Sequence, residues 1–130
     1  MTPENLKLYD ILTEVPLGTT GGFMKADILL IKKNALGKIE DTIIIENKLS
    51  QGTALTKRQK EGFGAIINGQ TSMKIKYDIK LNDNDVANYF NKDFNLTVSN
   101  NRIFKISDAG TDKIGNVTIN KITPDSADMT

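Results

Sequence analysis

The chain contains neither cysteine nor histidine among its 130 residues. The lack of cysteine excludes a disulfide framework and a thiolate zinc site. The lack of histidine excludes Ser-His-Asp triads, histidine-based metal motifs and imidazole acid–base chemistry. Any bound metal ion must therefore be held by oxygen ligands. This donor set favours Mg²⁺ or Mn²⁺ and leaves Zn²⁺ on carboxylates possible.

Long hydrophobic runs and a strong charge of one sign are also missing. No apolar run is long enough to span a membrane, and the start Met-Thr-Pro-Glu-Asn has no signal-peptide pattern. We therefore expect either a cytoplasmic protein or a fragment of a larger one. The net charge is +1, so any basic surface must be local. The length suits a single domain, residues 1–130, with one hydrophobic core.

Two apolar runs end or begin at acidic residues. Ile43–Ile45 is a run of three β-branched residues that indicates a buried strand. It is followed by Glu46, Asn47 and Lys48, of which the first and third share one face of a strand. Asp27 precedes a second apolar run. If the two strands pair, Asp27 can meet Glu46 and Lys48 at a metal site; alternatively, both strands simply leave the core through charged residues.

The order Asp, hydrophobic run, Glu-x-Lys and helix resembles the PD-(D/E)xK nuclease superfamily. The resemblance covers roughly residues 3–77, and the proline of the motif is absent because Ala26 precedes Asp27. It implies an acid on a first helix, Asp on one strand, (D/E)-x-K on the next and then a second helix. We accordingly expect an α/β (α+β) fold with a central mixed sheet flanked by helices.

The N-terminal segment has helical features. Thr2-Pro3 suits a helix start, and apolar residues recur at helical spacing at Leu8, Ile11, Leu12 and Val15. Glu4 lies at the top of this stripe. The family pattern makes Glu4 the first-helix acid, whereas the alternative is an acid that favours the positive end of the helix dipole.

A second helix is expected after Thr56. Thr56 followed three residues later by Gln59 forms a capping box. Gln59 also shares a face with Phe63 and Ile66, and in the nuclease superfamily a polar residue on this helix, often Gln, reaches into the site. The basic residues of this helix either contact nucleic-acid phosphates or form a solvated face; they are Lys57, Arg58 and Lys60.

The second half of the chain reads as a β-rich extension over about residues 79–123. Short strands are expected at 71–77, 96–98, 102–106 and 116–122, with a short helix that begins at Asp83 or Asn84 and runs through Phe90. The tail at 124–130 is small and polar, and we expect it to fray.

The resemblance also implies a division of roles. Asp27 and Glu46 would bind a divalent ion with the Asn47 carbonyl as a third ligand, and Glu4 would complete the site or hold a second ion. Lys48 would orient the attacking water and stabilise charge on the phosphate. The expected activity is a metal-dependent endonuclease, with DNA favoured over tRNA or other RNA as substrate.

A narrower resemblance concerns the biological context. The stretch Glu46–Ser50 with Leu55–Gln59 is similar to C-terminal nuclease domains of bacterial polymorphic toxins, of the RHS and contact-dependent growth inhibition types. It implies a domain delivered as part of a larger toxin into a target-cell cytoplasm, with a cognate immunity protein as partner. The competing interpretations are a non-catalytic β-rich binding or assembly module of a larger bacterial surface protein, and a nuclease fold with altered activity.

Overall fold

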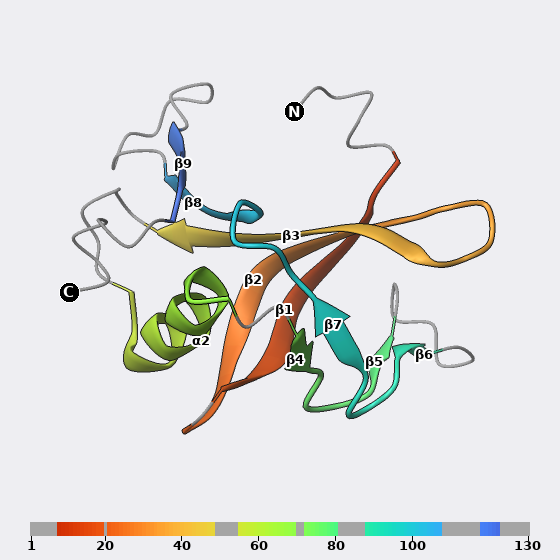
Figure 1. Cartoon of the computed structure of the whole chain (residues 1–130), viewed down its shortest axis with the longest axis horizontal. Helices are drawn as coiled ribbons and strands as arrows, with labels where there is room; N and C mark the ends of the chain where they lie inside the picture. Colours follow the sequence, from red (N-terminus) through yellow and green to blue (C-terminus); the bar gives the residue numbers. More distant parts are fainter. Residues whose placement is uncertain are drawn as a thin grey trace.

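The computed structural model describes residues 8–19, 21–48, 55–69, 72–80, 88–107 and 118–122. Within these ranges the chain forms one helix, α2 (Lys57–Ile67), and nine strands (Figure 1). The strands are β1 (Asp10–Thr19), β2 (Gly22–Lys33), β3 (Ile39–Lys48), β4 (Ser72–Lys74), β5 (Ile79–Lys80), β6 (Asn88–Phe90), β7 (Asn95–Thr97), β8 (Ile103–Ser107) and β9 (Thr118–Lys121).

A five-stranded mixed sheet is the centre of the fold, with the strand order β1-β2-β3-β8-β9. Strands β1, β2 and β3 form an antiparallel meander, β8 joins β3 in parallel, and β9 closes the sheet antiparallel to β8. The helix α2 lies between β3 and β8 in the sequence and packs beside β1 and β2 (Figure 1). The chain therefore has an α+β fold with a central sheet. Two small two-stranded sheets, β4-β7 and β5-β6, lie beside it.

The expected strands around the Glu-x-Lys motif are confirmed. Ile28 pairs with Ile45 and Leu30 with Ile43, so the two apolar runs lie side by side. The turn between them is fixed by Asn34, whose Oδ1 accepts hydrogen bonds from the Leu36 and Lys38 backbone N–H groups at 2.9 and 3.1 Å. Gly37 has φ = 79°, a left-handed conformation that glycine adopts without a steric penalty.

The predicted N-terminal helix is wrong over residues 10–15. These residues belong to β1, which pairs with β2 from Asp10↔Ile31 to Thr19↔Gly22. Leu8 and Ile11, two members of the expected inward stripe, are 60% and 56% exposed. The helical spacing was coincidental, because cross-strand pairing with β2 outweighs the weak local helix propensity. Glu4 lies outside the described residues.

Two smaller expectations also change. The short helix expected to run through Phe90 is wrong at its end, because Asn88–Phe90 form β6 against β5; Asp83 and Asn84 lie outside the described residues. The strand expected at 71–77 is shorter, with β4 ending at Lys74 and Ile75 making an isolated bridge to Leu17. The strands near 96–98, 102–106 and 116–122 are confirmed as β7, β8 and β9 within a residue or two.

The helix begins at the predicted capping box. Thr56 Oγ1 accepts a hydrogen bond from the Gln59 N–H at 3.2 Å, and Gln59 Oε1 accepts from the Thr56 N–H at 2.8 Å. Phe63 and Ile66 are fully buried on the same face. Gly62 allows close contact with the sheet, since a Cβ there would lie 2.6 Å from Met24 Sδ. Among the described residues, no helix has the length and apolar character needed to cross a membrane.

Candidate functional site

The candidate site begins at an irregularity in the β1–β2 pair. The buried positions of β1 change parity between Leu12 and Val15, and Glu14 between them has φ = 56°. This left-handed conformation is strained for any residue except glycine. The register of the pair places Asp27 opposite Glu14. On the other side of β2, continuing the β2–β3 register by one residue beyond the pair Ile28↔Ile45 places Asp27 opposite Glu46.

Asp27 and Glu46 lie close together at this point. The Asp27 Oδ2 accepts a hydrogen bond from the Asn47 N–H at 2.8 Å, and the Asp27 N–H lies 3.4 Å from Glu46 Oε1. Glu46 is fully buried, Asp27 is half-buried and Asn47 is exposed. The side-chain alternation expected for Glu46 and Asn47 is therefore confirmed, and the structure brings the two predicted carboxylates together.

Gln59 connects the helix to both charged residues of the Glu-x-Lys motif. Its Nε2 donates a 2.7 Å hydrogen bond to Glu46 Oε2, and its Oε1 accepts one from Lys48 Nζ at 2.9 Å. Gln59 is 9% exposed, so these bonds form away from bulk water, where they are stronger. The expected capping box is confirmed, and the oxygen that bonds Lys48 is the same one that completes the helix cap. A role of Gln59 in a nuclease site stays a prediction.

The environment of Glu46 favours its protonated form. Burial, followed by repulsion from the Asp27 carboxylate and hydrogen bonding to it, raises the pKa of Glu46 from 4.5 to about 8. The Lys48 ammonium and the backbone hydrogen bond from Asp27 oppose the rise with smaller effects. Two crowded carboxyl groups of this kind are relieved when a cation binds between them.

The site contains a lysine that the sequence analysis missed. Lys105 on β8 is in register with Glu46, and it is 2% exposed. Burial, followed by repulsion from Lys48, lowers the pKa of Lys105. No pattern in the sequence indicates that Lys105 is buried, because the apolar residues Ile103, Phe104 and Ile106 do not define which face of the strand is buried. The pairing of β8 with β3 decides that Lys105 lies beside the Glu-x-Lys motif.

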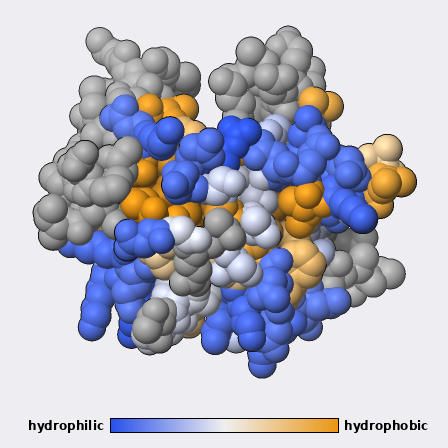
Figure 2. All heavy atoms as spheres, viewed as in Figure 1, coloured by the Kyte–Doolittle hydropathy of each residue, from blue (hydrophilic) through white to orange (hydrophobic). Residues whose placement is uncertain are grey.

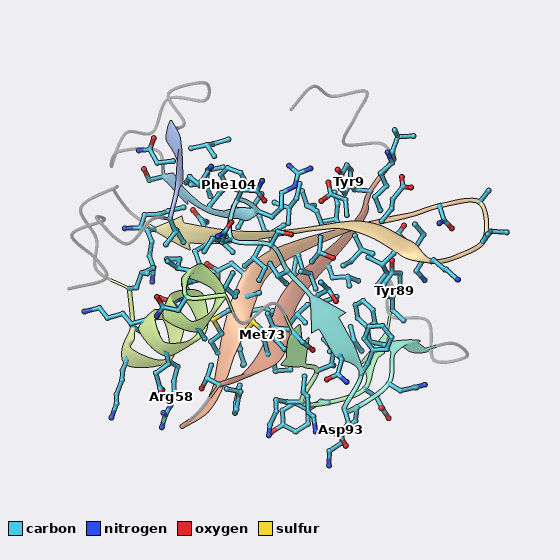
Figure 3. All side chains as sticks on the ribbon, in the orientation of Figure 1. Tyr9, Arg58, Met73, Tyr89, Asp93 and Phe104 are labelled. Carbon is cyan, nitrogen blue, oxygen red and sulfur yellow. The ribbon has the colours of Figure 1, made fainter. Side chains whose placement is uncertain are left out.

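The three basic residues of α2 lie in different environments. Arg58 binds Glu61 at 2.5 Å and lies against Gly21 and Gly22 in the β1–β2 turn (Figure 3). It therefore extends along the helix flank toward that turn. Lys57 is exposed and Lys60 is half-buried. Contact of these residues with nucleic acid stays a prediction.

The described residues offer two carboxylates for a metal ion, and no group of three or more acidic, histidine or cysteine side chains occurs within those ranges. Asp27 and Glu46 supply oxygen donors from adjacent strands, and burial, followed by repulsion from Asp27, raises the pKa of Glu46. This arrangement fits a hard divalent cation that takes its other ligands from backbone carbonyls and water. The Asn47 carbonyl stays a predicted third ligand.

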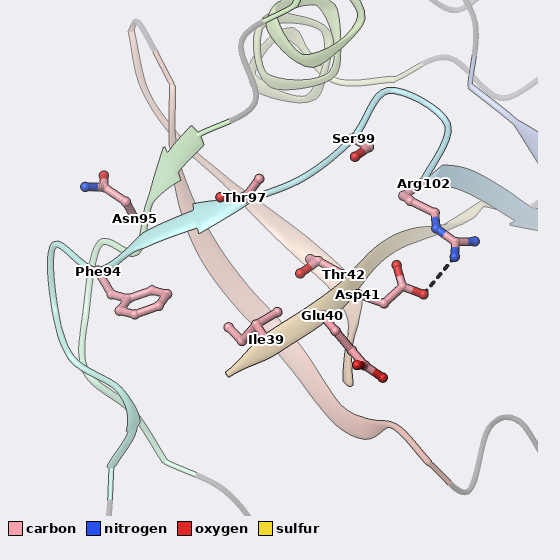
Figure 4. A pocket seen from close by; sticks show the side chains of 9 residues that line it. All are labelled: Ile39, Glu40, Asp41, Thr42, Phe94, Asn95, Thr97, Ser99 and Arg102. Atoms are coloured by element: carbon pink, nitrogen blue, oxygen red, sulfur yellow. Dashed lines mark hydrogen bonds and ion pairs between the residues drawn. The ribbon is translucent and has the colours of Figure 1, made fainter. Parts of the chain in front are cut away.

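A second polar region lies at the opposite end of β3. Asp41 accepts hydrogen bonds from the Tyr9 hydroxyl and from Arg102, the latter at 2.8 Å. Asp41 and Arg102 border a cavity of about 240 Å³ between β3 and the segment 94–102 (Figure 4). Thr42 also lines this cavity; it is 4% exposed, and its Oγ1 has no hydrogen-bond partner among the described residues.

The side of the molecule seen in Figure 2 is mostly hydrophilic, with apolar residues exposed in separate patches. A hollow of about 530 Å³ on the sheet face opposite α2 is lined mainly by hydrophobic side chains, among them Leu8, Ile45, Phe104 and Ile119.

Comparisons with known proteins identified no relative: no family model, no curated protein and no solved structure matches the chain.

Proposed function

We propose that the chain is a metal-dependent endonuclease that hydrolyses phosphodiester bonds, with DNA favoured over tRNA or other RNA. One observation carries the proposal. Asp27, Glu46, Lys48 and Gln59 come from three different elements and are joined by hydrogen bonds or close contact at the end of β3. A buried carboxyl next to a second acid and a lysine has no value for the core, since charged groups are costly to bury.

The proposed division of labour follows from these contacts. Asp27 and Glu46 hold the divalent ion, which when bound lowers the pKa of water and polarises a phosphate oxygen. Gln59 keeps Lys48 at the metal-binding carboxylates through its 2.7 and 2.9 Å hydrogen bonds. Lys48 orients the attacking water and stabilises the negative charge that develops on the phosphate. Direct attack of water leaves a 5′-phosphate.

The test is a cleavage assay on plasmid DNA and bulk tRNA in parallel, with Mg²⁺, Mn²⁺, Zn²⁺ or EDTA. We expect metal-dependent cleavage that is lost in Glu46→Gln and in Lys48→Ala. Glu40→Gln is the matched control, because Glu40 lies on the same strand but is exposed and bound to Lys32 at 3.0 Å. Cleavage that survives in both site variants would refute the proposal.

We further propose that the domain is the toxic C-terminal part of an interbacterial toxin, neutralised in the producing bacterium by an immunity protein. The support is the Glu46–Lys48 motif followed by the Thr56–Gln59 cap, with both segments meeting at the site. Expression of the wild type without a partner should stop growth, whereas Lys48→Ala should be tolerated. Equal growth of the two strains would count against a toxin.

The alternative is a non-catalytic binding module. The apolar hollow around Phe104 and Ile119 favours this alternative, because exposed apolar surface marks contact with other molecules. The two functions separate experimentally. A binding module should tolerate Glu46→Gln and Lys48→Ala, and it should lose its function when the opposite sheet face is made polar, for example by Phe104→Glu.

A further inference from the structure

The cavity between β3 and the segment 94–102 lies where the central sheet is open. Strand β8 pairs with β3 only from Ile44 onward, so within the described part of the chain residues 39–42 pair with β2 alone. The segment forms a turn before β8, in which the Arg102 N–H donates to the Ser99 carbonyl oxygen at 3.0 Å. The cavity of about 240 Å³ lies between this segment and the uncovered part of β3 (Figure 4). It is therefore at the opposite end of β3 from Glu46.

The charged side chains that line this cavity are paired with opposite charges. Asp41 forms an ion pair with Arg102 at 2.8 Å, and Glu40 forms one with Lys32 at 3.0 Å. Each pair largely cancels the field of its members, so neither an added cation nor an added anion gains much Coulomb energy here. The electrostatics of the cavity therefore favour a neutral ligand.

Hydroxyl and amide side chains supply the other polar contacts of the cavity. They come from both walls: Thr42 on β3, and Asn95, Thr97 and Ser99 on the facing segment. Such groups both donate and accept hydrogen bonds. Asn95 and Thr97 are alternate residues of β7 and are exposed, so their side chains lie on one face of that strand. These side chains match a ligand whose own groups donate and accept, as hydroxyl groups do.

Thr42 is the most deeply buried of these polar residues. It is 4% exposed, and its Oγ1 has no hydrogen-bond partner among the described residues. Figure 4 shows its side chain extending from β3 toward the segment 94–99. A buried hydroxyl without a partner destabilises a fold, and valine would fill nearly the same space without that cost. The hydroxyl therefore indicates a ligand group at the base of the cavity.

One end of the cavity is apolar. The Phe94 ring is 42% exposed, and it is held by stacking on Phe90 with the ring centroids 4.9 Å apart. Figure 4 shows the Phe94 ring directed toward Ile39. The face of an aromatic ring is negative and attracts positively polarised groups. Phe94 therefore suits a ligand that presents C–H groups on a face and hydroxyl groups at its edge.

We infer that this cavity binds a neutral monosaccharide. The sugar ring packs on Phe94 and Ile39, and its hydroxyl groups bond to Thr42, Asn95 and Thr97. The volume of about 240 Å³ lies below the roughly 300–1,000 Å³ of sites for drug-sized molecules and suits a single sugar ring. This binding does not rest on the proposed nuclease activity, because the metal-binding carboxylates lie at the other end of β3.

A titration of the isotope-labelled protein by two-dimensional NMR tests the inference. The probes are D-glucose, D-galactose, D-mannose and N-acetyl-D-glucosamine, with adenosine and inorganic phosphate for comparison. We expect at least one of the four sugars to bind with millimolar affinity, as suits so small a neutral ligand. The amide signals that shift should be those of residues 39–42 and 94–102.

Thr42→Val removes the buried hydroxyl. Sugar affinity should fall about tenfold, while the melting temperature should rise by about 3–6 °C because an unpaired polar group is lost. Thr19→Val is the matched control, because Thr19 Oγ1 is also buried without a partner among the described residues. Thr42 is level with Asp10 across the sheet, so Thr19 at the end of β1 lies roughly 30 Å away. Thr19→Val should leave sugar affinity unchanged.

Phe94→Leu removes the aromatic face and keeps an apolar side chain. Sugar affinity should fall about threefold or more. Tyr77→Leu is the matched control, since Tyr77 is 56% exposed and contacts Phe23 edge-on, outside the cavity. Circular dichroism verifies that each variant is folded. If Thr42→Val fails to fold, the comparison of Phe94→Leu with Tyr77→Leu still tests the site.

Four results would overturn the inference: no binding of any of the four sugars, signal shifts outside the cavity, unchanged affinity in folded Thr42→Val and Phe94→Leu, or tighter binding of adenosine or phosphate. The nuclease proposal fails separately. Sugar binding without cleavage supports this inference and refutes the nuclease, whereas cleavage without sugar binding does the reverse. Glu46→Gln should bind the sugar as the wild type does.

Discussion

The amide of Gln59 joins Glu46 to Lys48: its Nε2 donates to Glu46 Oε2 at 2.7 Å, and its Oε1 accepts from Lys48 Nζ at 2.9 Å. The same Oε1 accepts from the Thr56 N–H at 2.8 Å. One side chain therefore sets the start of α2 and the position of both charged residues of the motif. A substitution at Gln59 should therefore lower both the stability of the protein and its activity under the proposed function.

Gln59→Ala and Thr56→Ala separate these two roles. Both variants remove part of the capping box, and each should destabilise the protein by about 1 kcal/mol. The effect should be larger for Gln59→Ala, because it also removes the hydrogen bond that Gln59 donates to Oε2 of buried Glu46. Urea unfolding measures this difference. Under the proposed function, Gln59→Ala should also lower kcat, whereas Thr56→Ala should leave kcat nearly unchanged. Equal kcat in the two variants would show that Gln59 acts as a cap alone.

Glu46 should make stability depend on pH. Its pKa is raised from 4.5 to about 8 in the fold, so the folded state holds a proton that the unfolded chain has released. The contribution of Glu46 to the free energy of unfolding is therefore greatest below pH 4.5 and is lost as the pH rises toward 8. The free energy of unfolding falls over this range by at most about 1.4 kcal/mol per pH unit.

Urea unfolding of the wild type and Glu46→Gln across this range measures the effect. The Glu46→Gln profile should lack the decline. Mg²⁺ should stabilise the wild type at pH 8 and leave Glu46→Gln nearly unaffected, because the ion favours the ionised carboxylate. Identical pH profiles for the two proteins would contradict the raised pKa.

The effect of Gly62→Ala on stability should change sign when the residue at position 24 is changed. A Cβ at Gly62 would lie 2.6 Å from Met24 Sδ, so Gly62→Ala should destabilise the wild type by about 1–3 kcal/mol through overpacking. In a Met24→Ala background the clash is absent. The higher helix propensity of alanine should then stabilise by about 1 kcal/mol. A double-mutant cycle by urea unfolding gives the coupling, and purely additive effects would argue against this contact.

Replacing Glu14 by glycine should stabilise the protein, although position 14 lies in a strand. Its φ of 56° is left-handed, so Glu14→Gly relieves strain and should stabilise by about 0.5–1 kcal/mol despite the greater freedom of the unfolded chain. Thr13→Gly is the matched control on the adjacent exposed position, and it should destabilise by about 1 kcal/mol. Thermal unfolding of both variants reports the two signs; destabilisation by both would show that Glu14 is not strained.

Local sequence patterns were sufficient for the elements that carry the motif. The apolar run after Asp27, the apolar run before Glu46 and the cap at Thr56 all depend on residues close in the chain. The N-terminal stripe from Leu8 to Val15 led to the wrong prediction of a helix, because four apolar residues satisfy a helical period by chance. The strand that forms instead depends on pairing with β2, which is a non-local interaction. Propensity over so short a segment is weak beside such pairing.

The sequence by itself determined that Glu46 and Lys48 share a face, that Gln59 lies on the buried side of α2 and that oxygen atoms are the available metal ligands. Only the tertiary structure decided that Asp27 contacts both Glu46 and Asn47, since this depends on the β2–β3 register. It also decided that Lys105 joins the site, nearly sixty residues after Glu46. The reason is physical: alternation and capping act over a few neighbours, whereas strand order and register are set by the collective burial of the whole sheet.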